Sequence, residues 1–524
     1  MTLVHEMPCR LRDIVDAMPA KPGSALFHRR DGAMTRVPYP ECHRDALAVA
    51  RRLRARGVRP GDRVAVHGTT SYAWVLADLG CLLAGAVSVA LYPSAPAPRV
   101  VAAARESDCR LVLTERQEFT EAFGRAGVDA LPLDAVGAAG TSGPGPGPGA
   151  SCLPKGPSSG PFTIVSTSGT LSEPKLFAVH SAPLLYTMDR FAELYDIGGQ
   201  DRILLYLPLS HLPQRMMLYW GLGAGMDFVL SDPAHMARDG RELSPTLHVA
   251  VPRSLEHLRW RAENLRDRGE AADLGQAYAA VFGKAVKAVF VGSAPTPPAL
   301  LEALHEAGPP VYEVYGTTEL GMVGLNVPGA TRAGTVGRPI PWGEVRLDEG
   351  TGEILVRTPT PFLYGRLAGG EVVPESLRDT WQPTGDVGSV DEDGYLSVRG
   401  RLREFLALSN GEKVFVRPIE EAAAEATGAA ECVVLTTDSR RLQALLFFEF
   451  GAPGDREDCR RALGRLKRTL HSWERVQRFA LVDRLPSVEE GSLTETLKIR
   501  RHKVEETYGR DAAWHPVHRD REGN

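Results

Sequence analysis

The sequence lacks the features that mark structural metal sites, nucleic-acid-binding proteins and secreted proteins. Its seven cysteines are scattered over 524 residues, with no CxxC pair and no spacing typical of metal ligands. Basic residues are not in excess, because the formal net charge is -4, so we expect no nucleic-acid-binding surface. The first 20 residues do not contain the charged start and continuous apolar run of a signal peptide. Together these absences predict a cytoplasmic protein in a reducing compartment.

Long hydrophobic runs are also scarce. The most apolar stretch, from Ala73 to Leu91, approaches the length of a membrane span but contains Asp78 and many small residues. We interpret it as a buried helix followed by a buried strand, and we expect no membrane span.

The sequence does contain an alternation of helix-like and strand-like segments, over 41–114 and again over 201–330. This alternation predicts sheets covered by helices, whereas 335–400 is typical of short strands and turns. A chain of 524 residues is too long for one compact domain. We predict an α/β fold, in which a large N-terminal region of stacked α/β subdomains with a β-rich subdomain (1–400) precedes a small mobile α+β domain (401–524). Residues 137–160 are nearly all Gly, Pro, Ala and Ser, which predicts a surface loop.

One motif has the composition of a phosphate-binding loop. In STSGTLSEPKLFAVH, residues 166–180, a strand-like run leads into Ser, Thr and Gly and closes on Pro-Lys. Backbone N–H groups and hydroxyls in such a loop can cradle phosphate oxygens, and Lys175 adds a positive charge. The P-loop pattern GxxxxGK[ST] is absent. Taken alone, this motif fits a polar surface turn equally well.

A second motif, VYEVYGTTELG at 311–321, ends a buried strand in aromatic, hydroxyl and acidic residues. Tyr315 could stack on a base, Thr318 could meet a phosphate, and Glu319 could hold Mg²⁺ through oxygen. Taken alone, the segment fits better as a strand-to-turn junction with an ordinary exposed glutamate.

Two further motifs lie in the last third of the chain. In PTGDVGSVDEDGYLSVRGR, Asp386 sits in a glycine-flanked turn suited to ribose hydroxyls, and Arg401 follows a short strand. In GSLTETLKIRRHK, Lys498 lies between a polar segment and a basic one. Each of these residues alone would fit an exposed surface charge.

The four motifs in this order resemble the adenylate-forming superfamily of acyl-CoA synthetases, luciferases and peptide-synthetase adenylation domains. The resemblance extends from about residue 25 to 508. Segments such as YLPLSHLPQR, VAVPRSLEHL and LTETLKIRRHK are most similar to the long-chain fatty acyl-CoA synthetase branch. The resemblance implies an AMP-forming ligase that uses ATP and Mg²⁺ to activate a small-molecule acid, releases pyrophosphate, and passes the acyl group to a thiol.

The resemblance also assigns roles to particular positions. It implies that the catalytic residues are Lys498, Thr318, Glu319 as the Mg²⁺ ligand, and His211 near the substrate carboxylate. A histidine in an apolar stretch is more often a packed side chain, so the role of His211 depends on the resemblance alone. The implied nucleotide contacts are Thr167, Ser168, Gly169, Thr170, Lys175, Gly292, Ser293, Ala294, Tyr315, Gly316, Thr317, Asp386 and Arg401.

The chain departs from the family pattern in its phosphate loop, which reads TSGTLSEPKL where TSGTTGxPKG is usual. Leu171, Ser172 and Leu176 replace a threonine and two glycines. Loss of glycine removes backbone freedom where the chain must approach phosphate closely. We expect ATP binding to survive, because the TSGT core and the Pro-Lys pair remain. The segment between Val251 and Val286 is short for a long-chain enzyme, which favours a smaller or aromatic acid.

Three functional hypotheses remain open at this point. The first is a ligase that joins a carboxylic acid to coenzyme A or to a carrier protein. The second is an enzyme with an unusual acid or acceptor, such as one that activates nitrite for diazotisation of an aryl amine, or one that forms amides with an amine acceptor. The third, a non-catalytic adenylate binder, is disfavoured because all the charged positions of the pattern are occupied.

Overall fold

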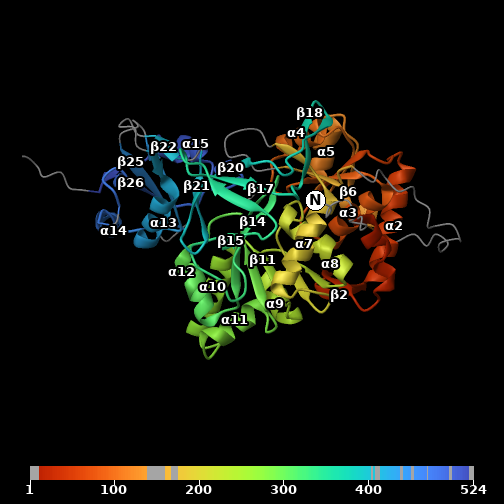
Figure 1. Ribbon diagram of the computed structural model, residues 1–524, viewed down its shortest axis with the longest axis horizontal. Coiled ribbons are helices and arrows are strands. Elements are labelled where there is room, and N and C mark those ends of the chain that lie inside the picture. Colours follow the sequence, from red (N-terminus) through yellow and green to blue (C-terminus); the bar gives the residue numbers. More distant parts are fainter. Residues whose placement is uncertain are drawn as a thin grey trace, which may run out of the picture. The chain divides into compact units, whose positions relative to one another are not determined.

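The fold is described from a computed structural model (Figure 1), which describes residues 11–137, 160–166, 175–402, 405–407, 413–436, 441–449, 454–468, 470–494 and 499–517. The chain divides into two compact units. The first comprises Met1–Thr167, Pro174–Glu344 and Val356–Gln382, and the second comprises Ser168–Glu173, Val345–Leu355 and Pro383–Asn524. Each unit is described by itself. The boundary that the sequence predicts between 400 and 401 stays a prediction.

The first unit contains a nine-stranded sheet in the order β15-β14-β13-β12-β11-β9-β10-β1-β2. Its strands are β1 (Ala25–Arg30), β2 (Ala33–Pro38), β9 (Arg202–Leu205), β10 (Asp227–Leu230), β11 (Leu247–Ala250), β12 (Ala288–Val291), β13 (Val311–Thr317), β14 (Gly321–Leu325) and β15 (Arg338–Pro339). From β1 to β13, each neighbouring pair in this order runs parallel. The carboxyl ends of these strands therefore lie along one edge of the sheet.

Helices cover both faces of this sheet, as alternation along β12 shows. Val289 and Val291 belong to a buried core with side chains of α10 (Pro252–Asp267), α11 (Leu274–Phe282) and α12 (Pro298–Ala307). Phe290, between them, instead packs edge-to-face against Phe191 of α7 (Ser181–Tyr195) on the opposite face. Successive side chains of a strand point to opposite faces, so the hydrophobic run of β12 serves two helical layers. In Figure 1, α7 lies beside α8 (Leu212–Ala224), both in yellow.

A second sheet of the same unit has eight strands in the order β19-β18-β8-β7-β4-β3-β5-β6. These are β3 (Arg63–His67), β4 (Val87–Leu91), β5 (Cys109–Thr114), β6 (Ala130–Pro132), β7 (Thr163–Ser166), β8 (Leu176–Val179), β18 (Leu363–Ala368) and β19 (Glu371–Pro374). Helix α3 (Tyr72–Ala84) leads into β4, and every residue of β4 is buried. The prediction of a buried helix and strand over the apolar stretch is thus confirmed. Every helix in the described ranges is too short or too polar to cross a membrane.

A buried ion pair links α3 to α8. The Arg215 guanidinium donates to both carboxylate oxygens of Asp78, at 2.8 and 3.2 Å, and both side chains are fully buried. The same guanidinium donates to Thr163 Oγ1 of β7 at 2.9 Å and to Ser88 Oγ of β4 at 3.0 Å. A buried charge pair is tolerated only where its remaining hydrogen-bonding groups are satisfied, as they are here. The network fixes α8 to two strands of the second sheet.

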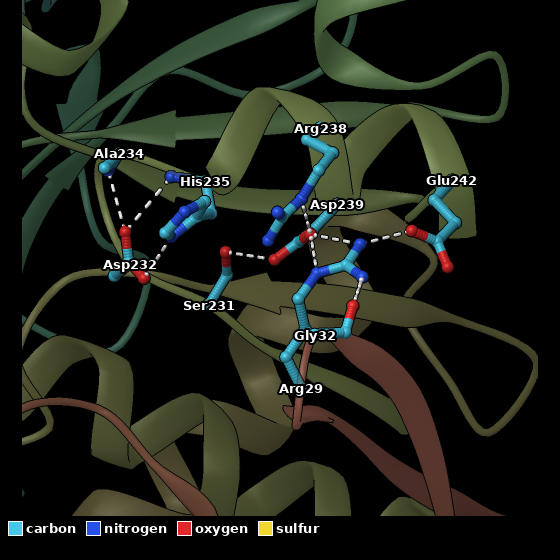
Figure 2. Close-up of polar contacts among 9 residues, drawn as sticks. All are labelled: Arg29, Gly32, Ser231, Asp232, Ala234, His235, Arg238, Asp239 and Glu242. Carbon is cyan, nitrogen blue, oxygen red and sulfur yellow. Dashed lines mark hydrogen bonds and ion pairs between the residues drawn. The ribbon is translucent and has the colours of Figure 1, made fainter.

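A second polar cluster ties the β1–β2 edge of the nine-stranded sheet to α9 (Met236–Leu243) (Figure 2). Asp239 of α9 is almost fully buried, and its carboxylate accepts from Arg29 Nε at 2.9 Å and from Ser231 Oγ at 2.7 Å. Arg29 also pairs with the more exposed Glu242. Beside this cluster, Asp232 lies 2.7 Å from His235 Nδ1. The edge hairpin is therefore held by side chains as well as by the strand ladder.

The second unit contains two four-stranded sheets. One has the order β16-β17-β20-β21 and is formed by β16 (Glu344–Leu347), β17 (Glu353–Arg357), β20 (Gln382–Val390) and β21 (Leu396–Arg401), of which β16, β17 and β20 begin or end in the first unit. The other has the order β24-β25-β26-β27, with β24 (Glu431–Thr436), β25 (Leu442–Phe447), β26 (Val476–Val482) and β27 (His515–Pro516). Helices α13 (Val416–Thr427) and α14 (Arg456–Leu466) pack on one face of the latter sheet. The predicted α/β fold class, with several helix-covered sheets and a β-rich part, is confirmed.

Candidate active site

Three of the segments singled out from the sequence meet at the carboxyl edge of the nine-stranded sheet. His211 follows β9 and immediately precedes α8, Gly292 to Ala294 follow β12, and Tyr315 lies near the end of β13. Strands β9, β11, β12 and β13 are consecutive neighbours and run parallel. Ligands of parallel sheets bind outside this edge, so the topology gathers these segments where a substrate would bind.

Two of the predicted residues are in direct contact. His211 Nε2 lies 2.9 Å from Ser293 Oγ, although 82 residues separate them in the chain. Ser293 is exposed and His211 is partly exposed, so the pair is accessible to solvent. Ser293 has a φ of 70°, in the left-handed region that residues other than glycine rarely adopt. A side chain held in such a conformation at a strand end is a recurrent feature of functional sites.

The loop that carries Ser293 packs tightly against β13. A Cβ atom at Gly292 would lie 2.6 Å from the carbonyl oxygen of Val314, so only glycine fits there without a shift. Further along the loop, the Thr296 N–H donates to the buried carboxylate of Glu313 at 3.2 Å. These contacts hold the loop at both ends.

The segment from Tyr315 to Glu319 forms the end of β13 and the turn into β14. The ladder between the two strands shifts register between Tyr315 and Gly316, and a Cβ atom at Gly316 would collide with the Gly321 backbone. In the turn, Thr317 Oγ1 accepts from the Leu320 N–H at 3.1 Å. Thr318 and Glu319 occupy the turn itself and are partly exposed.

The Glu319 carboxylate makes no hydrogen bond or ion pair with any residue that the structure describes. Its backbone carbonyl accepts from the Leu363 N–H at 2.9 Å, which fixes the turn. A partly exposed carboxylate without a cationic partner suits a hard cation such as Mg²⁺, which binds through oxygen and keeps several water or phosphate ligands. No group of three or more His, Cys, Asp or Glu side chains among the described residues is arranged to hold a metal ion.

Asp386 and Arg401 face each other in the second unit. They are register partners in the antiparallel β20–β21 pair, and Arg401 Nε lies 2.9 Å from Asp386 Oδ1. Asp386 is buried and Arg401 is exposed. The Asp386 N–H donates to Thr384 Oγ1 at 3.1 Å, and the Gly385 N–H donates to Glu353 at 2.8 Å. Sequence analysis missed Thr384 and Glu353. The Thr-Gly-Asp spacing, typical of a hydroxyl-capped turn, could have indicated Thr384.

The structure describes only some of the remaining predicted residues. Lys175 is exposed and directly precedes β8, whose first residue, Leu176, pairs with the last residue of β7, Ser166. The other predicted positions of the phosphate loop, and the predicted catalytic lysine, lie outside the described residues: Thr167, Ser168, Gly169, Thr170 and Lys498.

Comparison with known proteins gives relatives along most of the chain. A model of the family described as AMP-binding enzyme matches residues 17–363. The chain is 28% identical over 455 residues to long-chain-fatty-acid–CoA ligase FadD15 of Mycobacterium bovis, covering 76% of this chain and 75% of the relative. It is 28% identical over 508 residues to the fatty acid–[acyl-carrier-protein] ligase ScoC of Streptomyces coeruleorubidus, covering 91% and 92%.

A solved structure has the same fold. O-succinylbenzoate coenzyme A synthetase from Bacillus subtilis, in complex with ATP and magnesium ion, matches with a TM-score of 0.75 at 21% identity. The match covers 94% of this chain and 99% of that one. The resemblance drawn from the four motifs is confirmed, because the family model spans well over half of the sequence. The chain belongs to the AMP-binding enzyme family.

Proposed function

We propose that the chain uses ATP to convert a carboxylic acid into an acyl-adenylate, with release of pyrophosphate, and then transfers the acyl group to a thiol. The observation that carries the proposal is the meeting of His211, Ser293 and the Tyr315–Glu319 segment at one carboxyl edge of a parallel sheet. Membership in the family and the ligase relatives that align over three quarters or more of the chain support the same reaction.

The first half-reaction is a displacement at phosphorus. A carboxylate oxygen forms a bond to the α-phosphorus of ATP, and the bond from this phosphorus to the bridging oxygen of pyrophosphate breaks. The acid reacts as its carboxylate, so no proton needs to be removed. Negative charge grows on the phosphoryl oxygens in the transition state, and positioned cations and N–H donors stabilise it. We propose that Lys498 and Lys175 supply charge, and that His211 contacts the substrate carboxylate.

The nucleotide contacts follow from residue chemistry. We propose that Tyr315 stacks on adenine, that Thr318 meets phosphate, and that Asp386 binds the ribose hydroxyls with Arg401 beside it. We propose Glu319 as the protein ligand of Mg²⁺, consistent with its accessible carboxylate. When bound, Mg²⁺ would neutralise charge on the phosphate oxygens.

The acceptor is proposed to be coenzyme A or the thiol of a carrier protein. One aligned relative is named as a CoA ligase and another as an acyl-carrier-protein ligase, which supports either thiol. The relatives do not favour nitrite activation or amide formation with an amine. A cytoplasmic location also stays a prediction.

The test is ATP-dependent pyrophosphate release, measured first without acceptor and then with coenzyme A or a loaded carrier protein. The acids would include short and long fatty acids, aryl and cinnamic-type acids, and nitrite. We expect release with at least one carboxylate, and continued turnover only after a thiol is added. Release with nitrite alone would refute the proposal, and so would silence with every carboxylate. Two matched variants test the proposed Mg²⁺ ligand. Glu319→Gln should slow pyrophosphate release, whereas Glu349→Gln, which changes an exposed glutamate of the second unit, should not.

A further inference from the structure

Ser293 adopts a backbone conformation that glycine would adopt at lower free energy. Its φ of 70° places it among six described residues other than glycine with positive φ. Two of the others, Asp196 and Ser244, lie directly after the helices α7 and α9, where a left-handed residue is common. Ser293 instead follows a buried strand at the candidate active site. An L-residue in this region is disfavoured by about 1 kcal/mol or more, and the contacts around the loop must offset that cost.

The hydrogen bond to His211 is one of these contacts. Ser293 Oγ lies 2.9 Å from His211 Nε2, and the serine makes this contact from a left-handed backbone. The loop is held on either side of Ser293, since a side chain at Gly292 would meet β13 and the Thr296 N–H donates to the buried Glu313. The hydroxyl is therefore presented from a fixed loop. A partner on one ring nitrogen sets the orientation and tautomer of a histidine.

We propose that Ser293 is a positioning residue for His211 in recognition of the acid substrate. This inference rests on the proposed function, in which His211 contacts the carboxylate. The resemblance names Ser293 as a nucleotide contact, whereas its hydroxyl lies against His211 in the structure. We therefore assign the hydroxyl to the acid, through the imidazole, and expect it to govern the apparent affinity for the acid and not that for ATP. Because the imidazole is already ordered, less conformational entropy is lost when the acid binds.

Ser293→Ala and Ser293→Gly, compared by acid-dependent ATP–pyrophosphate exchange, test the inference. Alanine at position 293 removes the hydroxyl but keeps the unfavourable free energy of the left-handed backbone, whereas glycine removes both. We expect both variants to raise the KM for the acid by about five-fold, the effect of one ordinary hydrogen bond, with the KM for ATP unchanged. The glycine variant should melt at the same temperature as the wild type or higher, which separates the lost hydroxyl from damage to the fold.

Two comparisons make the test specific. In a His211→Ala background, Ser293→Ala should have no further effect on the KM for the acid, because the hydroxyl then has no ring to position. Ser244→Ala is the matched control, since it removes a hydroxyl from another left-handed serine, three residues before the amino end of β11. It should leave both KM values unchanged.

The inference is overturned if Ser293→Ala matches the wild type, if it changes the KM for ATP instead, or if its effect persists without His211. These results would leave the proposed function standing. Absence of exchange by the wild-type protein with every carboxylate would instead remove the proposed function, and the inference with it.

Discussion

Arg401 lies 2.9 Å from the Asp386 carboxylate, across a two-stranded ladder in which the two residues are register partners. The side chain of Asp386 is only 7% exposed, whereas that of Arg401 is 48% exposed. A nearly buried carboxylate that an exposed guanidinium contacts is well ordered, and a carboxylate offers several acceptor sites for hydrogen bonds. This arrangement suits the ribose-binding role proposed for Asp386.

Replacement of Asp386 is expected to weaken ATP binding selectively. Asp386→Ala should raise the KM for ATP at least ten-fold, because hydrogen bonds to a charged group contribute about 1.5–3 kcal/mol. The KM for the acid should stay within two-fold of the wild-type value. The measurement is pyrophosphate exchange with ATP varied at saturating acid. Arg399→Ala is the matched control, since it removes a positive charge from β21 that has no ion pair among the described residues. Equal effects of the two variants would contradict the assignment.

Lys498→Ala should abolish adenylation and leave the fold intact. A lost transition-state charge costs about 2–4 kcal/mol by analogy with a lost oxyanion donor, which corresponds to a fall in rate of about 30-fold to 1,000-fold. Single-turnover formation of the acyl-adenylate measures this step, and thermal unfolding checks the fold. Lys503→Ala, which removes a neighbouring lysine that pairs with Glu506, should retain the wild-type rate. Persistent adenylation in the Lys498 variant would show that the catalytic lysine is assigned wrongly.

The Asp239 cluster predicts a large stability effect far from the chemistry (Figure 2). The Asp239 side chain is 2% exposed and shares Arg29 with Glu242, whose side chain is 45% exposed. Asp239→Ala should lower the free energy of unfolding by about 3 kcal/mol, because it leaves a guanidinium and a serine hydroxyl without their buried acceptor. Glu242→Ala breaks an exposed pair of the same arginine and should cost about 1 kcal/mol or less. Urea unfolding of both variants measures the contrast, and equal losses would mean that burial does not decide the effect.

His248 predicts a loss of stability on mild acidification. It is buried in β11, its Nε2 lies 2.9 Å from the Phe282 carbonyl oxygen, and burial lowers its pKa from 6.5 to about 4. The unfolded chain therefore binds a proton at a higher pH than the folded one. Protonation of His248 does not affect stability above about pH 6.5. As the pH falls to 4, it lowers the free energy of unfolding by about 3 kcal/mol.

His248→Gln tests this dependence, because the amide can still donate to the carbonyl but cannot titrate. Urea unfolding from pH 7 to pH 4.5 should give a shallower loss of stability for the variant. His67, whose pKa burial also lowers to about 4, provides a second titrating site and should leave part of the slope in place. Parallel curves for wild type and variant would contradict the buried neutral state of His248.

The sequence was sufficient for the fold class and for the identity of many candidate residues, and insufficient for the way in which they meet. Alternation predicted helix-covered sheets because burial of apolar residues at a fixed period is a local property. The resemblance named His211 and Ser293 separately. Their hydrogen bond joins residues 82 positions apart, one of which has a left-handed φ that residue type does not encode.

The sequence alone also did not identify the buried partner of Asp78. A charge within an apolar run indicates that some partner exists, but Arg215 lies 137 residues away, and only the hydrogen bonds between α8 and α3 identify it. For Asp386 and Arg401, the pairing depends on a register shift at Val387 and Gly388 that turn residues alone do not predict.

The Arg215 network also joins α8 to β7 by a hydrogen bond between buried side chains. Helix α8 begins directly after His211, while β7 ends at Ser166, where the predicted phosphate loop follows in the sequence. Arg215 joins them through its contact with Thr163. If the acid displaces the start of α8, this contact offers a route to the strand before the ATP loop, and we then expect the two substrates to be thermodynamically linked. Because such linkage is reciprocal, ATP should change the affinity for the acid by the same factor as the acid changes the affinity for ATP.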